Sequence, residues 1–260
     1  MADSQTLRTF CWSELGTADA RAAKDFYGRV FGWTFADEDM GELGTYTKIR
    51  LGEHEIGGLY ELSGPMFEGV PPHWTYYVST EDVDATASRA AELGAEIDMP
   101  PMDVHDAGRM AAITDPTGAK LALFQPRGHR GTTADPFAPG AFGWVELQTR
   151  DPARAKAFYT DLFGWHAKDD PSGHYTEWHL PGAQPFGGLI AMDERWGDAP
   201  PAWLGYVMVE DCDATFARVT DAGGRGLVGP HDIEHVGRFA VVADPQGAVL
   251  AFIRLAADHA

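Results

Sequence analysis

Almost the whole chain is one sequence written twice. The stretch 10–126 returns as 142–255, about 130 residues further along. The recurring motifs, in the same order in both copies, are WSEL and WVEL, KDFY and KAFY, FGW, GG, EDxDAT, GR and DPxGA. Solenoid units have periods of about 20 to 50 residues, so a repeat this long predicts a duplicated domain. Each half of the 260 residues is long enough to bury its own core, and we expect domains at 1–126 and 142–260 with a linker at 127–141.

Composition and charge exclude several classes of protein. The chain is 44% hydrophobic and 23% charged, which is typical of a globular protein rather than a disordered or membrane-spanning one. A formal net charge of −19 disfavours nucleic acids and anionic membranes as partners, because both bind clusters of Lys and Arg. The start, MADSQTLRTF, lacks the basic end and apolar core of a signal peptide. We therefore expect a cytoplasmic protein, monomer or homodimer, whose partner is a small molecule.

The chain contains two cysteines, Cys11 and Cys212. They lie in unlike elements, so a disulfide framework is not expected, and a CxxC metal site is impossible. We expect both to be buried or half-buried free thiols.

Hydrophobic spacing predicts an α+β fold. After Asp19, a residue type that favours helix N-caps, apolar side chains follow at 23, 26, 27 and 30, the spacing of one helix face. A second helix ends near Gly94, and the β-like runs around the two helices cover 10–15, 46–51, 55–61, 73–79, 109–114 and 119–125. In the second copy Asp151 is the expected cap, and Pro152 occupies the first turn, where proline is tolerated. Each copy therefore predicts two βαβββ units, and the chain four.

Four βαβββ units with FY in the first helix, FGW after it and DPxGA before the last strand resemble the glyoxalase/bleomycin resistance/dioxygenase superfamily, also called vicinal oxygen chelate proteins. The resemblance covers about nine-tenths of the chain. The tandem layout and the Pro-Pro-x-Trp restart are also similar to two-domain glyoxalase-like proteins of actinobacteria. The resemblance implies two glyoxalase-like domains in which paired units curl into half-open, cup-shaped mixed sheets, with the function inside the cups.

In metal-using members, the resemblance implies ligands on the first and last strands of the units. These are His, Glu or Gln, which hold a divalent ion and leave positions open for the substrate. The matched positions here hold Trp12 and Trp144, Gly57-Gly58 and Gly187-Gly188, Trp74-Thr75 and Trp203-Leu204, and Ala122 and Ala251. None supplies the expected ligand, so we expect no catalytic metal and no other cofactor. The glycine pairs predict a bulge or a close approach of two backbones.

A divalent metal at a relocated site is the alternative. The segments before the two Gly-Arg motifs are read as loops, and they hold side chains able to ligate: Asp103, His105 and Asp106 in the first copy, and His231, Asp232, Glu234 and His235 in the second.

Aromatic residues and carboxylates stand where the metal ligands are missing. Strand side chains alternate between faces, so Glu14 shares a face with Trp12, and Glu146 with Trp144. Aromatic rings bind flat ligands, and a carboxylate among them accepts hydrogen bonds from a ligand's hydroxyl or amine. The residues expected to bind ligand are Trp12, Trp74, Tyr76, Met110, Phe124, Trp144, Trp203, Tyr206 and Phe239.

Several of these positions have a core-packing alternative, beginning with Trp12 and Trp144, because a tryptophan on a short strand is more often part of the core than of a pocket. Tyr77 is the alternative to Tyr76, and a shift of one residue would move Trp74 and Trp203 from the pocket to the core. Core packing is expected for Trp33 and Trp165.

Glu14 and Glu146 admit two roles. A half-buried carboxylate beside an indole has a raised pKa and can act as a general acid or base, which makes both residues catalytic candidates. The role we favour is an ion pair, structural or ligand-anchoring, with Arg109 and Arg238 as the expected partners.

Three functions follow from these residues. We expect a metal-independent protein that binds an aromatic or polycyclic metabolite or antibiotic, for sequestration or resistance. The alternative is an enzyme, a lyase, isomerase or hydroxylase-like protein that uses Glu14 or Glu146, or a relocated metal. A pure interaction module has no support beyond the missing ligands.

Overall fold

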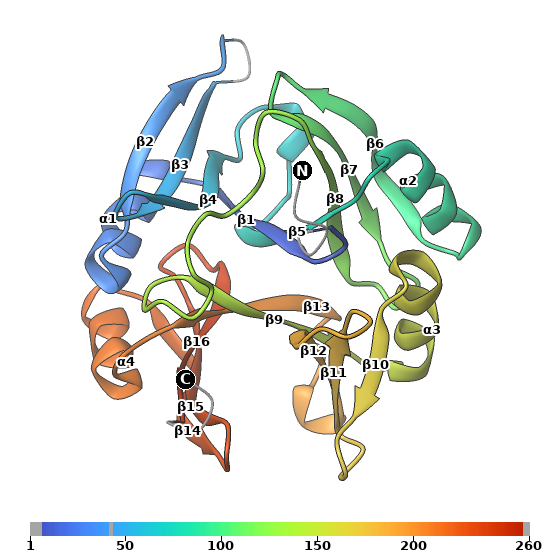
Figure 1. Ribbon diagram of the computed structural model, residues 1–260. Helices are drawn as coiled ribbons and strands as arrows, with labels where there is room; N and C mark the ends of the chain where they lie inside the picture. The colour runs from blue at the N-terminus through green and yellow to red at the C-terminus, as the bar shows by residue number, and fades with distance from the viewer. Residues whose placement is uncertain (1–6, 42–43, 257–260) are drawn as a thin grey trace. The chain divides into compact units, whose positions relative to one another are not determined.

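The computed structural model describes residues 7–41 and 44–256. Residues 1–6, part of the start that lacks signal-peptide features, lie outside this description. Four βαβββ units follow one another along the chain, coloured from blue to red in Figure 1. None of the helices in the described ranges has the length and apolar character that crossing a bilayer requires.

The elements of the first repeat begin with the unit β1 Phe10–Thr17, α1 Ala20–Phe31, β2 Thr34–Asp39, β3 Thr45–Leu51 and β4 His54–Glu61. After the short 3-10 helix η2 Pro65–Phe67 comes the unit β5 His73–Ser79, α2 Val83–Glu92, β6 Glu96–Val104, β7 Gly108–Thr114 and β8 Lys120–Pro126.

The second repeat has the same plan. Its first unit is β9 Phe142–Thr149, α3 Pro152–Phe163, β10 His166–Asp169, β11 Tyr175–His179 and β12 Pro185–Ala191. After η3 Glu194–Trp196, the last unit is β13 Ala202–Met208, α4 Cys212–Asp221, β14 Arg225–Ile233, β15 Gly237–Ala243 and β16 Val249–Leu255.

The strands form two eight-stranded mixed sheets. Their orders are β2-β3-β4-β1-β5-β8-β7-β6 and β10-β11-β12-β9-β13-β16-β15-β14. β1 runs parallel to β4, and β5 to β8, whereas β3 and β4 are antiparallel. Neither sheet closes into a barrel, because each order begins and ends on a different strand. The predicted α+β fold of four βαβββ units with mixed sheets is confirmed.

The chain divides into two compact units, and each combines parts of both repeats. One comprises the described part of 1–11 with 75–130 and 144–204. The other comprises 12–74, 131–143 and 205 onward. Each unit therefore holds one βαβββ module from each repeat, and the expected linker 127–141 is divided between the two.

Predicted helix caps are present. The side chain of Asp19 accepts a hydrogen bond from the backbone N–H of Ala22 at 2.9 Å, and that of Asp151 accepts from Arg154 at 3.0 Å. Helix α1 ends at Gly32, whose left-handed φ of 73° favours glycine. The helix buries the predicted positions Ala23, Phe26, Tyr27 and Val30.

The FY and DPxGA motifs meet inside one unit. The hydroxyl of Tyr27 on α1 donates to Asp244 Oδ2 at 2.9 Å, and Trp74 Nε1 donates to the same hydroxyl at 3.1 Å. The other oxygen of Asp244 accepts three backbone N–H groups of its own turn, from 246, 247 and 248. Tyr27 and Asp244 are 0% and 4% exposed, so a helix of one repeat is fixed to a turn of the other by buried hydrogen bonds.

The second unit repeats this arrangement. The hydroxyl of Tyr159 donates to Asp115 Oδ2 at 2.6 Å, and Trp203 Nε1 donates to that hydroxyl at 3.1 Å. Burial, followed by the charge of Asp115, raises the pKa of Tyr159 well above its usual value, so the phenol remains a donor. Trp74 and Trp203, two predicted ligand-binding residues, thus support the core. Trp33 and Trp165 are buried, at 3% and 0% exposed, as expected.

Candidate functional site

A tryptophan, a tyrosine and a glutamate form a hydrogen-bonded chain on one sheet face of the unit that contains 12–74. Trp12 and Glu14 lie on β1, and Tyr46 lies on β3. Trp12 Nε1 donates to the Tyr46 hydroxyl at 3.0 Å, and this hydroxyl donates to Glu14 Oε1 at 2.8 Å. We call Trp12, Tyr46 and Glu14 the first triad.

A glycine on the intervening strand makes room for the first triad. β4 lies between β1 and β3, and Gly58 is in register with Glu14 on one side and Lys48 on the other. A Cβ atom at Gly58 would overlap the Tyr46 hydroxyl. Only glycine therefore leaves the space in which the tyrosine reaches across β4 to the carboxylate.

The predicted close approach at the glycine pair is confirmed. A Cβ atom at Gly57 would lie 2.5 Å from the backbone oxygen of Ser13, closer than real Cβ contacts allow. A register shift between Ile49 and Arg50 marks a bulge in the same strand pair.

The unit that contains 144–204 carries an equivalent triad. Trp144 Nε1 donates to the Tyr175 hydroxyl at 2.8 Å, and Tyr175 hydrogen-bonds to Glu146. Gly188 is in register with Glu146, and a Cβ atom there would overlap the Tyr175 hydroxyl. We call Trp144, Tyr175 and Glu146 the second triad.

Each triad is partly shielded from solvent. Trp12 is 8% exposed and Glu146 is 6% exposed, and the other members are half-buried: Glu14, Tyr46, Trp144 and Tyr175. Burial, and then the charge of Glu14, raises the pKa of Tyr46 well above its usual value, and burial with Glu146 does the same for Tyr175. Because the phenols stay protonated at neutral pH, each tyrosine orients its carboxylate by donating to it.

Sequence reasoning placed the tryptophan and the glutamate together but missed the tyrosine. Tyr46 and Tyr175 occupy equivalent positions in the two repeats, each on the strand beside a glycine pair. A recurring tyrosine opposite a recurring glycine was the available signal, because a missing side chain on one strand often accommodates a long one from its neighbour.

The predicted pairing of Arg109 with Glu14 is wrong. Arg109 instead makes a bidentate pair with Asp84, at 2.6 and 2.9 Å, and contacts Asp103 at 3.2 Å. Arg109 alternates with Met110 on β7, so it points to the sheet face covered by α2, where Asp84 begins the helix.

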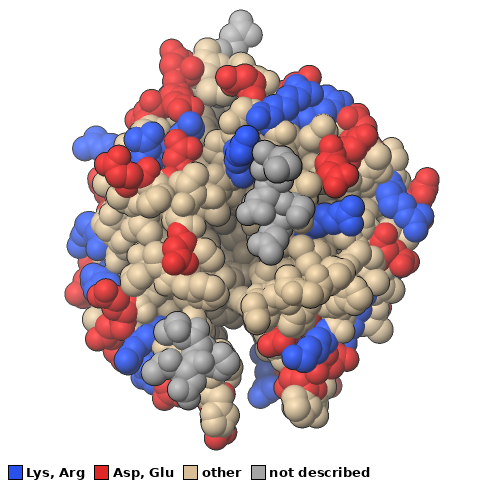
Figure 2. Space-filling view, viewed as in Figure 1, with Lys and Arg blue, Asp and Glu red and all other residues tan. Residues whose placement is uncertain are grey.

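The pairing predicted for Arg238 with Glu146 is wrong for the same reason. Arg238 pairs with Asp213, at 2.8 and 2.9 Å, and with Asp232 at 3.0 Å. Figure 2 shows such acidic and basic side chains interspersed over the visible face of the described residues.

The predicted lining residues of the first repeat divide between two sheet faces. Tyr77 is in register with Ala122, and its ring contacts that of Phe124 edge-on at 6.4 Å. Met110 is in register with Phe124 and shares its face. Tyr76, with Trp74, lies on the opposite face of β5, because neighbouring strand residues alternate. The residue that accompanies Met110 and Phe124 is therefore Tyr77, not the predicted Tyr76.

The second repeat shows the same division. The ring of Tyr206 lies 6.3 Å from that of Phe239, which in turn contacts His231 at 6.1 Å. Trp203, three residues before Tyr206 on β13, lies on the opposite face and donates to Tyr159.

The residues where the resemblance implies metal ligands do not fit a divalent ion. Trp12 and Trp144 are hydrogen-bond donors to tyrosines, Gly58 and Gly188 have no side chain, and Ala122 is apolar. In the described ranges, no three side chains of His, Cys, Asp or Glu are grouped so that they could hold a metal.

The alternative metal-binding segments are partly strand rather than loop. Asp103 lies on β6, where it pairs with Arg109 and Arg127. His231 and Asp232 lie on β14. β6 and β14 are edge strands, and both contain proline, a residue that favours loops when only the sequence is considered. The four remaining candidates lie in turns, His105 and Asp106 between β6 and β7, and Glu234 and His235 between β14 and β15, where exposed His235 contacts Glu234 at 3.4 Å.

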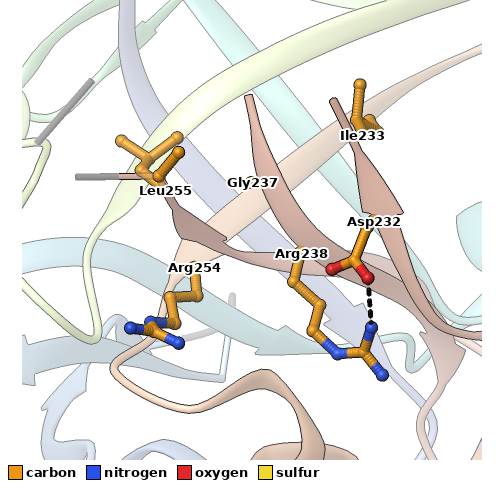
Figure 3. Close-up of a pocket in the computed structure, with 7 residues that line it drawn as sticks. Asp232, Ile233, Gly237, Arg238, Arg254 and Leu255 are labelled. Atoms are coloured by element: carbon orange, nitrogen blue, oxygen red, sulfur yellow. Dashed lines mark hydrogen bonds and ion pairs between the residues drawn. The ribbon is translucent and has the colours of Figure 1, made fainter. Parts of the chain in front are cut away.

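A surface hollow of about 300 Å³ lies at the ends of β14, β15 and β16. Arg238 on β15 and Arg254 on β16 are directly opposite each other in the strand register. Figure 3 shows the hydrogen bond between Arg238 and Asp232. None of the predicted ligand-binding residues lines this hollow.

The family model described as Glyoxalase/Bleomycin resistance protein/Dioxygenase superfamily matches the chain twice, over residues 11–123 and 141–252. The protein named "Putative glyoxylase CFP32" of Mycobacterium tuberculosis is 37% identical over 246 residues, which cover 94% of this chain and 93% of that protein. The "Anthracycline biosynthesis protein DnrV" of Streptomyces peucetius is 34% identical over 257 residues, covering 94% of this chain and 92% of that one.

Solved structures share the fold. The Mn(II)-bound glyoxalase from Novosphingobium aromaticivorans superposes with a TM-score of 0.66 at 15% identity, over 96% of this chain and 82% of that one. The 2,3-dioxygenase LapB from Pseudomonas sp. KL28 gives 0.60 at 12% identity, over 96% and 92%. With the sequence matches over both repeats, these findings show that the chain belongs to the glyoxalase/bleomycin resistance protein/dioxygenase superfamily.

Proposed function

We propose that this chain binds a flat aromatic or polycyclic small molecule at its triads, without a metal, and sequesters it. The repeated triad is the observation that carries this proposal. In each repeat an indole lies beside a carboxylate whose direction a tyrosine fixes. An indole binds a flat ring at little entropic cost, and a carboxylate, which accepts up to about four hydrogen bonds, takes a ligand's hydroxyl or amine beside the tyrosine.

The name of one relative supports this class of ligand. DnrV carries the name of an anthracycline biosynthesis protein. Anthracyclines are polycyclic aromatic compounds with several hydroxyls and an amino sugar, so their chemistry suits an indole beside a carboxylate. Sequestration of such an antibiotic or metabolite requires affinity and no reaction.

Tryptophan fluorescence during a titration with an anthracycline tests the proposal. Trp12→Phe and Trp144→Phe should each remove part of the quenching and weaken binding at one site about fivefold to tenfold, since an aromatic contact contributes about 1 kcal/mol. Trp196→Phe is the matched control, because Trp196 lies on η3 outside both triads. Unchanged fluorescence with anthracyclines and with a panel of other polycyclic aromatics would contradict the proposal.

An enzyme of the same superfamily is the second candidate. Glu146 is 6% exposed and hydrogen-bonded to Tyr175, and a carboxylate in such a setting suits proton transfer. A lyase, isomerase or hydroxylase-like activity would then use Glu14 or Glu146 as its acid or base.

Glutamine substitution separates the two candidates. In an enzyme, Glu14→Gln and Glu146→Gln abolish turnover and leave ligand affinity nearly intact, because the amide keeps the shape of the carboxylate but cannot carry the proton. A binding protein has no turnover to lose. Mass spectrometry of the ligand after incubation with wild type and with each variant measures the difference.

A further inference from the structure

The two triads differ in the charge that lies across the glycine from the glutamate. We infer that the second triad takes the cationic group of a ligand, whereas the first triad takes a neutral one, and that Glu177 and Lys48 determine this difference. The inference rests on the proposed function, because it specifies the ligand chemistry of the same two triads.

Strand register fixes the positions of the two determining residues. Across Gly58 from Glu14 lies Lys48, and across Gly188 from Glu146 lies Glu177. Neighbouring strands are about 4.8 Å apart, so each pair of Cα atoms is separated by about 10 Å on the same sheet face. The glycine between them contributes no side chain. A bound ligand group beside the glutamate is therefore within reach of the second charge.

In the first repeat this second charge is a fixed ammonium. Lys48 Nζ lies 3.0 Å from Glu38 Oε1 and 3.3 Å from Glu55 Oε1, and its side chain is 22% exposed. Two carboxylates thus hold the ammonium on the face that Glu14 occupies. This ammonium already occupies the place that a cationic ligand group would take between the carboxylates, so a neutral hydroxyl is the better partner for Glu14.

In the second repeat the equivalent position is a carboxylate. Glu177 Oε2 contacts His179 Nε2 at 3.0 Å and Lys168 Nζ at 3.5 Å, and the Lys168 side chain is 72% exposed. The ammonium of Lys168 is consequently screened by water, whereas Glu177 is only 37% exposed and Glu146 is 6% exposed. Two carboxylates on one face, with their lysine in solvent, are complementary to a ligand ammonium such as an amino sugar.

Each repeat supplies the matched substitution for the other. The variants are Glu177→Lys and Lys48→Glu, and the probes are an anthracycline with a protonated amino sugar and its N-acetylated, neutral derivative. Trp12→Phe and Trp144→Phe backgrounds weaken one triad at a time, so that fluorescence titration reports mainly on the other. Glu177→Gln, with a urea midpoint for every variant, separates a loss of charge from a loss of folding.

In the Trp12→Phe background, which reports on the second triad, the cationic probe should bind about tenfold more tightly than the neutral one, and Glu177→Lys should remove that preference. In the Trp144→Phe background the preference should be absent, and Lys48→Glu should create it. The preference should also shrink as salt is raised. Equal binding of both probes to both triads, unaffected by the exchanges, would overturn this inference and leave the proposed function standing. Failure of both probes to bind either triad would overturn the proposed function as well.

Discussion

Alanine at Gly58 should destabilise the protein by closing the space that the first triad requires. The Cβ atom of an alanine would overlap the Tyr46 hydroxyl and come within 2.5 Å of the carbon that carries it. Since the three nearest atoms all belong to the half-buried, hydrogen-bonded side chain of Tyr46, this side chain must either leave its place or remain under strain.

The cost can be worked out for both cases. If the ring leaves, the bond from Trp12 is lost, worth about 1 kcal/mol, with the bond to the Glu14 carboxylate, worth about 2 kcal/mol. If the ring stays, overpacking costs about 1–3 kcal/mol. The two cases together span about 1–3 kcal/mol, which corresponds to a urea midpoint lower by about 1 M at a typical slope.

Urea unfolding followed by circular dichroism measures this change. Gly229→Ala is the control, because Gly229 also lies on a strand and a Cβ atom there meets nothing within 4 Å. In a Tyr46→Ala background, Gly58→Ala should cost almost nothing more, because the obstructing ring is absent. A Gly58→Ala midpoint equal to that of Gly229→Ala would refute the reasoning.

Three further changes have defined outcomes. Tyr27→Phe removes the phenol that bonds to the buried Asp244 carboxylate and the buried Trp74 indole. The free energy of unfolding, measured in urea, should therefore fall by about 3 kcal/mol, and a loss below about 0.5 kcal/mol would contradict the importance of these hydrogen bonds. Since the pKa values of Tyr46 and Tyr175 are raised in the folded state, their stabilisation is complete below about pH 10 and is lost as pH rises further. Phenolate absorbance of the native protein at about pH 11 should therefore be the same in wild type and the double phenylalanine variant, and a lower value in the variant would show that these phenols ionise normally. The Arg109 guanidinium lowers the pKa of Asp84 through their hydrogen bonds, so this pair stabilises the fold above the ordinary value of 3.8 and ceases to do so as pH falls below it; Asp84→Asn should weaken that acid dependence, and an unchanged acid-unfolding curve would count against it.

The sequence was sufficient for the order of the elements, the caps and the α1 core face, because each depends on local spacing. It did not locate β2 or β6. These are the two edge strands of their sheet, and most of their residues are exposed. Neither an alternation of apolar residues nor a buried run therefore marks them in the sequence.

Tertiary arrangement accounts for the remaining differences. The compact units join modules from both repeats, an arrangement that the repeat in the sequence does not reveal. No local pattern reveals that Tyr27 bonds to Asp244, more than 200 residues away. The sequence around Arg109 did not show which sheet face its side chain occupies. On that face it meets Asp84 of α2.

Binding of a polycyclic aromatic ligand to metal-free protein tests the role of the triads most directly. Protein treated with a chelator and verified free of divalent ions should quench and saturate on titration with an anthracycline. Affinity should fall at one site with Trp12→Phe and at the other with Trp144→Phe, and it should not change when Mn²⁺ or Zn²⁺ is restored. Binding that requires a stoichiometric divalent ion, or that persists unchanged when both tryptophans are replaced, would contradict metal-free binding at the triads.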